Sequence, residues 1–134
     1  MKCIYCGSAT QVTNSRHQKR LNQVWRRRKC VACGAIFSTT EGANTSQALS
    51  VHKNNGLEPF SRDTLFISVY DSLRHRKTVL DDATALTSTI ISTLTPLAAD
   101  AVIDRDIIVT ITTTVLQRFD KPAATHYQAF HPVF

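Results

Sequence analysis

The chain opens with Met1-Lys2-Cys3-Ile4-Tyr5-Cys6-Gly7, and a second segment of the same type follows at Cys30-Val31-Ala32-Cys33-Gly34. These two segments hold all four cysteines of the 134-residue chain. In each Cys-x-x-Cys pair both thiolates can turn back onto one ion, and two such pairs complete a tetrahedral sulfur site that suits zinc. A glycine directly after each pair favours the positive φ of a tight turn. We therefore predict a Zn²⁺ site formed by Cys3, Cys6, Cys30 and Cys33.

Two disulfide bonds, or a thioredoxin-like redox pair, are the alternative interpretations of these cysteines. No apolar signal segment opens the chain, so we expect a reducing, cytoplasmic location, in which such pairs are typical of metal sites. The thioredoxin-like motif occurs singly, between a strand and a helix. Because four thiolates fill the coordination shell and leave no position for water, we expect the metal to be structural.

Positive charge is concentrated at the start of the chain. Residues 1–45 contain eight lysines and arginines against one acidic residue, Glu41, whereas residues 46–134 contain eight cations and nine acidic residues. This asymmetry indicates a polyanionic partner for the basic part. We predict two domains in an α+β chain: a small antiparallel zinc ribbon, residues 1–45, and a mostly helical domain with an N-terminal β-hairpin, residues 46–134.

Between the cysteine pairs the sequence favours short strands. Residues 10–16, 24–29 and 35–40 carry strand formers, and residues 17–23 are polar enough for a loop. Four consecutive cations, residues 26–29, follow Trp25, and in a strand they alternate between two faces, so Glu41 cannot pair with all of them. They are either a solvated face or phosphate contacts. We predict DNA binding by Arg16, Arg20, Trp25, Arg26, Arg27, Arg28 and Lys29.

The second half reads as a hairpin followed by helices. We expect a linker at residues 41–47 and a hairpin turn at Asn54-Asn55-Gly56. Helices are expected from Ser61, Asp81 and Asp104, with Pro96 ending or kinking the second and a short last helix running from Pro122 to Phe130. The cations at residues 74–77 fit either a helix C-terminus or an anion site. The run at residues 107–115 also has strand propensity, although its length and acidic start favour a helix. No run of about 18 apolar residues occurs, so we expect no membrane span.

Taken together, these motifs resemble the NrdR-type transcriptional repressors of ribonucleotide reductase genes, which join a zinc ribbon to an ATP-cone. The first half carries Met1-Lys2-Cys3-x-Tyr5-Cys6-Gly7-Ser8, Asn14-Ser15-Arg16, and Arg26-Arg27-Arg28-x-Cys30-x-x-Cys33-Gly34-x-x-Phe37-Ser38-Thr39-x-Glu41. The second half carries Val51-x-Lys53, Glu58-Pro59-Phe60 and Leu116-x-x-x-Asp120.

The resemblance implies a zinc-dependent repressor that binds double-stranded promoter DNA and responds to ATP and dATP through its oligomeric state. It implies a homo-oligomer assembled through the cone, nucleoid-associated when bound to DNA. Combined with the cations noted above, it implies nucleotide contacts from Val51, Lys53, Asn54, Arg76, Lys77 and His126.

The chain also departs from the family pattern. Thr64 stands where the family has a lysine, and His126 where it has an arginine. The alternative is therefore a zinc-ribbon protein-interaction module with a degenerate cone that no longer senses nucleotide. An enzyme is not expected, because the sequence shows no cluster of nucleophile, base and orienting group and no Walker-type loop.

Overall fold

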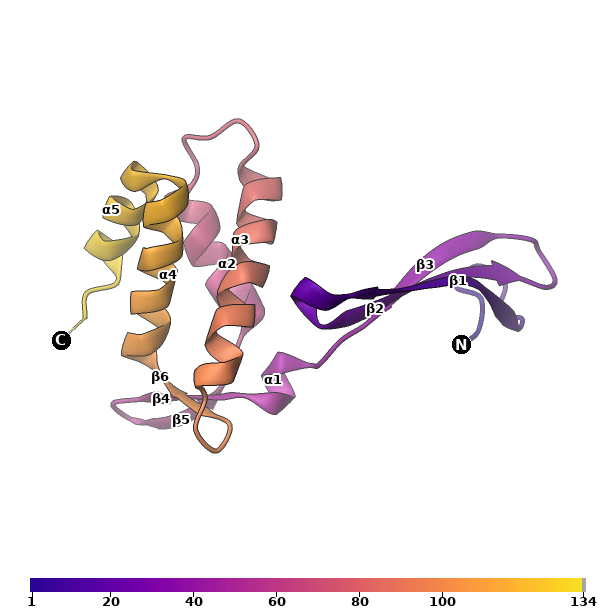
Figure 1. Ribbon diagram of the computed structural model, residues 1–134, viewed down its shortest axis with the longest axis horizontal. Helices are drawn as coiled ribbons and strands as arrows, with labels where there is room; N and C mark the ends of the chain where they lie inside the picture. The colour runs from indigo at the N-terminus through magenta and orange to yellow at the C-terminus, as the bar shows by residue number, and fades with distance from the viewer. Residues whose placement is uncertain (134) are drawn as a thin grey trace. The chain divides into compact units, whose positions relative to one another are not determined.

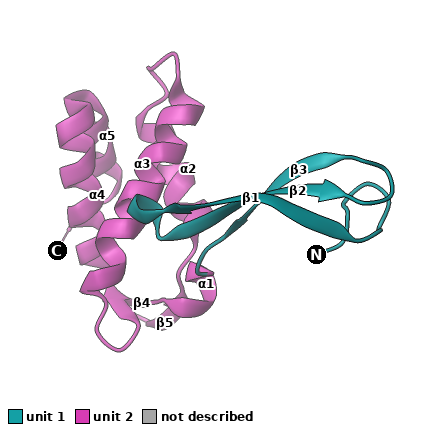
Figure 2. Cartoon of the chain, turned by 45° about the vertical axis from the view of Figure 1, so that its right-hand side comes forward, with its two compact units in different colours: residues 1–43 teal, residues 44–134 magenta. Residues whose placement is uncertain are grey.

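The computed structural model describes residues 1–133, which divide into two compact units. The first unit spans residues 1–43 and the second begins at Asn44 (Figure 2). The chain has the expected α+β fold, with an antiparallel sheet in the first unit and a mostly helical second unit that has a β-hairpin near its start (Figure 1).

The first unit is a three-stranded antiparallel sheet in the order β1-β2-β3. Its strands are β1 (Thr10–Gln18), β2 (Gln23–Cys30) and β3 (Ile36–Glu41), with a short 3₁₀ turn, η1 (Lys19–Leu21), between the first two. The central strand β2 carries the cationic run. A β-bulge at Thr13 shifts the register between Val12 and Asn14, which raises the local twist of β1.

The second unit packs helices against a small sheet. Its elements in chain order are α1 (Thr45–Ala48), β4 (Ser50–Lys53), β5 (Gly56–Pro59), α2 (Arg62–Ser72), α3 (Val79–Leu94), η2 (Thr95–Leu97), β6 (Val102–Asp104), α4 (Arg105–Phe119) and α5 (Lys121–Phe130). The sheet order is β5-β4-β6, in which β4 pairs antiparallel with β5 and parallel with β6. In Figure 1 the long helices stand on this sheet.

The helix boundaries follow local chemistry. Ser61 caps α2, because its hydroxyl accepts a hydrogen bond from the backbone N–H of Thr64 at 3.1 Å. Pro96 falls in the 3₁₀ turn η2 directly after α3, so the expected end of that helix is confirmed. The stretch with competing strand propensity is helical in α4, since Val109, Thr112 and Leu116 are buried on one face.

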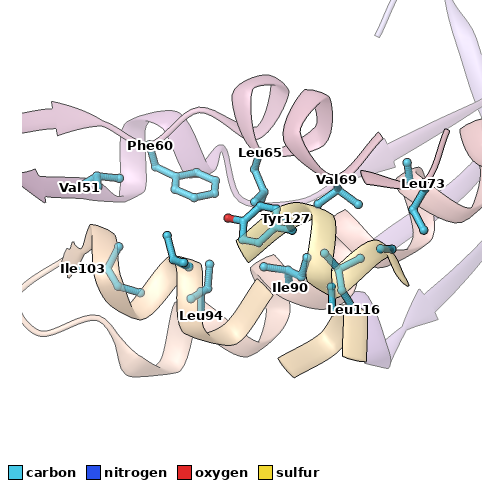
Figure 3. Packing of buried hydrophobic residues seen from close by; sticks show 14 of the residues in the cluster. Val51, Phe60, Leu65, Val69, Leu73, Ile90, Leu94, Ile103, Leu116 and Tyr127 are labelled. Atoms are coloured by element: carbon cyan, nitrogen blue, oxygen red, sulfur yellow. The ribbon is translucent and has the colours of Figure 1, made fainter. Parts of the chain in front are cut away.

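One hydrophobic core holds the second unit together (Figure 3). It joins the sheet to all the long helices through fully or almost fully buried side chains, among them Val51, Phe60, Val69, Ile90, Ile103, Leu116 and Tyr127. Among the long helices, α4 packs directly against β4 and β6, and α5 packs against α4 and α2.

Three expectations for the second unit are corrected. The linker predicted at residues 41–47 is shorter, because Glu41 ends β3 and Asn44 caps the four-residue helix α1. Strand β6 was not expected. Asp104 occupies the N-cap position of α4 but makes no capping hydrogen bond through its side chain, which instead contacts His52 Nδ1 at 3.1 Å.

Candidate metal centre and nucleic-acid interface

The four cysteines converge at one end of the ribbon. Their Sγ atoms all lie within 4.8 Å of one another. The closest pairs come from different Cys-x-x-Cys segments: Cys3 Sγ lies 3.8 Å from Cys33 Sγ, and Cys6 Sγ lies 3.5 Å from Cys30 Sγ. Zinc–sulfur bonds of about 2.3 Å in a tetrahedron require sulfurs about 3.8 Å apart, so the cluster fits a Zn²⁺.

The backbone around each cysteine pair is built to hold thiolates. Gly7 and Gly34 have φ values of 75° and 73°, which confirms the left-handed conformation expected after each pair. Backbone N–H groups point at the sulfurs: that of Tyr5 donates to Cys3 Sγ, and those of Ala32 and Cys33 donate to Cys30 Sγ, each at 3.4 Å. These donors favour the deprotonated sulfur that zinc needs.

Four adjacent thiols do not all ionise easily by themselves. Hydrogen bonds from the side chain and then the backbone of Ser8 lower the pKa of the Cys6 thiol to about 6. The pKa of Cys33 is raised to about 11, because hydrogen bonding to the Cys30 sulfur and burial outweigh the lowering effect of the Ala35 backbone N–H. A divalent cation removes this conflict, since it neutralises the thiolates together. The donor set is therefore that of a closed, structural zinc site.

The cations predicted to bind DNA lie on the ribbon but differ in their surroundings. Arg26 forms an ion pair with Glu41 at 2.8 Å, and the Nε–H of Arg28 donates to Thr39 Oγ1 at 3.2 Å. The Arg16 guanidinium lies 5.9 Å from the centre of the Trp25 ring. Arg20 is exposed on the turn η1, and the exposed side chains on β2 are those of Arg27 and Lys29. The ribbon thus presents a cationic sheet on which Arg26, Arg28 and Arg16 already contact neighbouring side chains.

In the second unit, Val51 and Lys53 line a cavity of about 290 Å³ between the β4–β5 hairpin and the starts of α2 and α4. Lys53 Nζ forms an ion pair there with Glu58 at 2.5 Å. Asn54 lines a neighbouring cavity of about 510 Å³, which also contains Lys53, His52 and Asp104. Three of the predicted nucleotide residues therefore lie around the hairpin.

The other three predicted nucleotide residues lie away from the hairpin cavity. Arg76 pairs with Asp82 at 2.9 Å and Asp120 at 3.0 Å, and its guanidinium covers the Phe119 ring at 4.4 Å, which ties the α2–α3 loop to the start of α5. Lys77 is exposed on the same loop. His126 lines a separate cavity of about 340 Å³, with its Nδ1 3.3 Å from Ser72 Oγ.

Sequence reasoning missed Arg105 of the hairpin cavity, whereas for Tyr127 it left packing of the last helix and a binding role open. Arg105 is the first residue of α4 and forms an ion pair with Asp106 at 3.4 Å. Tyr127 is 2% exposed, and burial raises the pKa of its hydroxyl. No local signal marks Arg105, because only the fold brings the start of α4 beside β4.

Within residues 1–133, no helix is both long and apolar enough to cross a membrane.

Comparison with known proteins supports the resemblance seen in the motifs. Residues 1–41 match the family described as transcriptional repressor NrdR-like, N-terminal domain. A transcriptional repressor NrdR of Symbiobacterium thermophilum is 38% identical over 76 residues, which is 57% of this chain and 51% of that protein. A transcriptional repressor NrdR of Staphylococcus aureus strain JH9 is 39% identical over 77 residues, 57% of this chain and 49% of that protein.

The chain spans about half the length of the curated relatives that it matches. The matches confirm the resemblance to NrdR-type repressors, and for the ribbon they agree with the cysteine geometry. The relatives are named for a regulatory and not a catalytic role.

Proposed function

We propose that this relative of the NrdR-type repressors is a zinc-dependent, DNA-binding transcriptional regulator. The observation that carries the proposal is the cysteine cluster, which fixes a sheet rich in cations and holding a single acidic residue, Glu41. A rigid cationic sheet suits the phosphate backbone, because lysine and arginine contacts release condensed counterions. Zinc is the scaffold in this proposal and takes no part in chemistry.

The test is a salt titration of binding to duplex DNA by the zinc-loaded chain. If each ribbon neutralises about four phosphates, the logarithm of affinity falls against the logarithm of salt with a slope of about −3.6. Fluorescence anisotropy with a labelled promoter duplex measures this slope. A slope near zero on every duplex tested contradicts DNA binding.

We further propose that the second unit binds ATP or dATP in the cavity beside the hairpin. Support comes from Val51 and Lys53, which lie there, and from the lining side chains of Arg105 and Tyr127. Because Lys53 is paired with Glu58, an incoming phosphate has to replace this carboxylate as its partner.

Equilibrium dialysis with ATP and dATP tests the site. We expect Lys53→Gln to weaken binding about tenfold, and Arg118→Gln, which removes one positive charge outside the cavity, to preserve it.

The nucleotide would act through assembly. A single small ribbon offers too little surface for tight promoter binding, so we propose a homo-oligomer built through the second unit. A ligand shifts such an equilibrium only if it binds the two assemblies with different affinity. Light scattering of the chain alone, with ATP and with dATP is expected to give different masses. One unchanged mass in all three samples contradicts the switch.

A second candidate function rests on the same hairpin. With Lys53 paired to Glu58 and Arg76 paired to Asp82 and Asp120, two of the cationic side chains predicted for phosphate already form ion pairs within the chain. This favours a degenerate cone that serves only in protein interaction. Dialysis that detects no nucleotide binding by the wild-type chain, together with no binding to duplex DNA, supports this candidate over the repressor.

A further inference from the structure

The pairing register of the ribbon divides its cationic run between two faces of one sheet. Paired residues on neighbouring antiparallel strands point to the same face, and successive residues alternate. Arg16 pairs with Trp25, Asn14 with Arg27, and Arg27 with Ser38. Together with Lys29, two residues further along β2, these side chains lie on one face, which we name the basic face: Asn14, Arg16, Trp25, Arg27, Lys29 and Ser38.

The opposite face uses its cations internally. It carries Arg26 and Arg28, the former paired with Glu41 at 2.8 Å and the latter bonded to Thr39 at 3.2 Å. Glu41 is the only acidic residue of residues 1–43, and its pairing with Val24 places it on this face. The basic face is therefore free of acidic side chains.

The solvent exposure of the four cations on β2 follows the same division. Arg27 and Lys29 are exposed, as is Ser38 on the same face, whereas Arg26, Arg28 and Thr39 on the opposite face are half-buried. A phosphate oxygen reaching Arg27 or Lys29 displaces no carboxylate, whereas one reaching Arg26 has to compete with Glu41. The basic face is thus ready for a polyanion at a lower desolvation cost.

We propose that the basic face, and not the opposite one, is the surface that lies against duplex DNA. This inference rests on the proposed DNA binding and specifies which side chains perform it. Arg27 and Lys29 project about 7 Å apart along β2, far enough to reach different phosphates. Arg16 supplies a third cation, and the neutral donors Asn14 and Ser38 flank Arg27. These three cations then account for about three of the roughly four phosphates proposed for each ribbon.

The state of Trp25 favours duplex over single-stranded nucleic acid. An unpaired base needs an open aromatic face on which to stack. Here the Arg16 guanidinium lies over the Trp25 ring at 5.9 Å, and the indole is half-buried. The contact with the ring therefore holds the Arg16 guanidinium on the solvent side of the sheet, where a phosphate can bind it.

Two double variants on the same strand test the assignment with equal loss of charge. In the zinc-loaded full chain, Arg27→Gln with Lys29→Gln removes two cations from the basic face, and Arg26→Gln with Arg28→Gln removes two from the other. We expect the first pair to reduce the steepness of the salt slope by about 1.8 and to weaken duplex binding at least about tenfold. The second pair is expected to lower affinity less than about threefold, through the long-range field alone.

Zinc stoichiometry and Trp25 emission of both variants verify that the ribbon is folded. Equal losses in the two variants, or a larger loss from Arg26 and Arg28, overturn the face assignment while leaving DNA binding in place. A wild-type chain that shows no salt-dependent binding overturns the proposed function itself.

Trp25, the only tryptophan of the chain, gives an independent readout. Because it lies on the basic face, saturating duplex is expected to reduce its quenching by acrylamide at least about twofold. Quenching that does not change at saturation overturns contact through this face. Tighter binding of a single strand than of the matching duplex overturns the choice of duplex.

Discussion

Within residues 1–43, all of which the structure describes, the buried side chains are Cys3 and Cys30, at 4% and 1% exposure. The second unit instead surrounds a continuous cluster of buried aliphatic and aromatic side chains. One unit is held by a metal and the other by apolar burial. Because the stability of the ribbon does not depend on a hydrophobic core, nearly every side chain of its sheet can contact solvent or a ligand.

The largest expected effect comes from removing zinc, which separates the two units. Structural zinc sites supply about 10–16 kcal/mol of apparent binding free energy, so chelation or Cys30→Ser is expected to unfold the ribbon completely. Trp25 emission reports on the ribbon, and helical circular dichroism reports on the second unit. We expect the first signal to change and the second to persist. Helical signal lost together with zinc contradicts the independence of the two units.

A change in the apolar core is the converse experiment. Leu116 is fully buried, so Leu116→Ala is expected to lower the free energy of unfolding of the second unit by about 2–5 kcal/mol. Leu57→Ala, at a position 60% exposed, is the matched control and is expected to cost less than about 0.5 kcal/mol. Urea titration of the helical signal measures both. Zinc content is expected to stay unchanged in each variant, and a loss of zinc in Leu116→Ala contradicts the comparison.

The smallest of these effects is a loss of folding stability of the second unit at acidic pH. The side chain of Asp120 is 7% exposed, and although burial raises its pKa, hydrogen bonds from His75, the Ala123 backbone and Arg76 hold that pKa at about 2. This lies below the unfolded value of about 3.9, so the stabilisation is complete above about pH 5 and is lost progressively as the pH falls through 2. The loss is on the order of 2–3 kcal/mol.

Asp120→Asn is expected to remove this part of the pH dependence of helix unfolding. Asp71→Asn is the control, because Asp71 is 43% exposed and its ion pair with Arg74 lies on the surface. Thermal melts of the helical signal between pH 2 and pH 6 distinguish them. If the melting temperature of Asp120→Asn depends on pH as steeply as that of the wild type, other groups cause the acid sensitivity.

Much of the ribbon could be predicted because its determinants are local. Cysteine spacing and the glycines after each pair fix the metal end, and short runs of strand formers fix the sheet. The alternation of Arg26 to Lys29 between two faces was also expected. Which of these cations pairs with Glu41 was not, because it depends on how β2 aligns with β3, and the bulge at Thr13 that adjusts β1 has no sequence signature.

The second unit was predictable at helix starts with strong local signals, such as Ser61 and Pro122. Its cavities were not, because each gathers residues from distant segments. Charge and resemblance alone group Arg76 and His126 with Lys53 as predicted nucleotide contacts. The structure places Arg76 in an ion-pair network near the end of α4 and His126 beside Ser72, away from the cavity that Lys53 lines. Long-range packing decides these positions, and no single window of sequence contains it.

The parallel pairing of β4 with β6 joins residues 50 and 102. This pair of strands can therefore form only after residue 102 has been synthesised. As the chain is synthesised, every cysteine of the ribbon emerges before the first residue of β4, so zinc can be captured while the rest is incomplete. The β4–β5 hairpin, by contrast, presents an unpaired edge until β6 arrives, after the whole of α3. During that interval the sheet of the second unit is incomplete, and the free edge of β4 can pair with another copy of the chain.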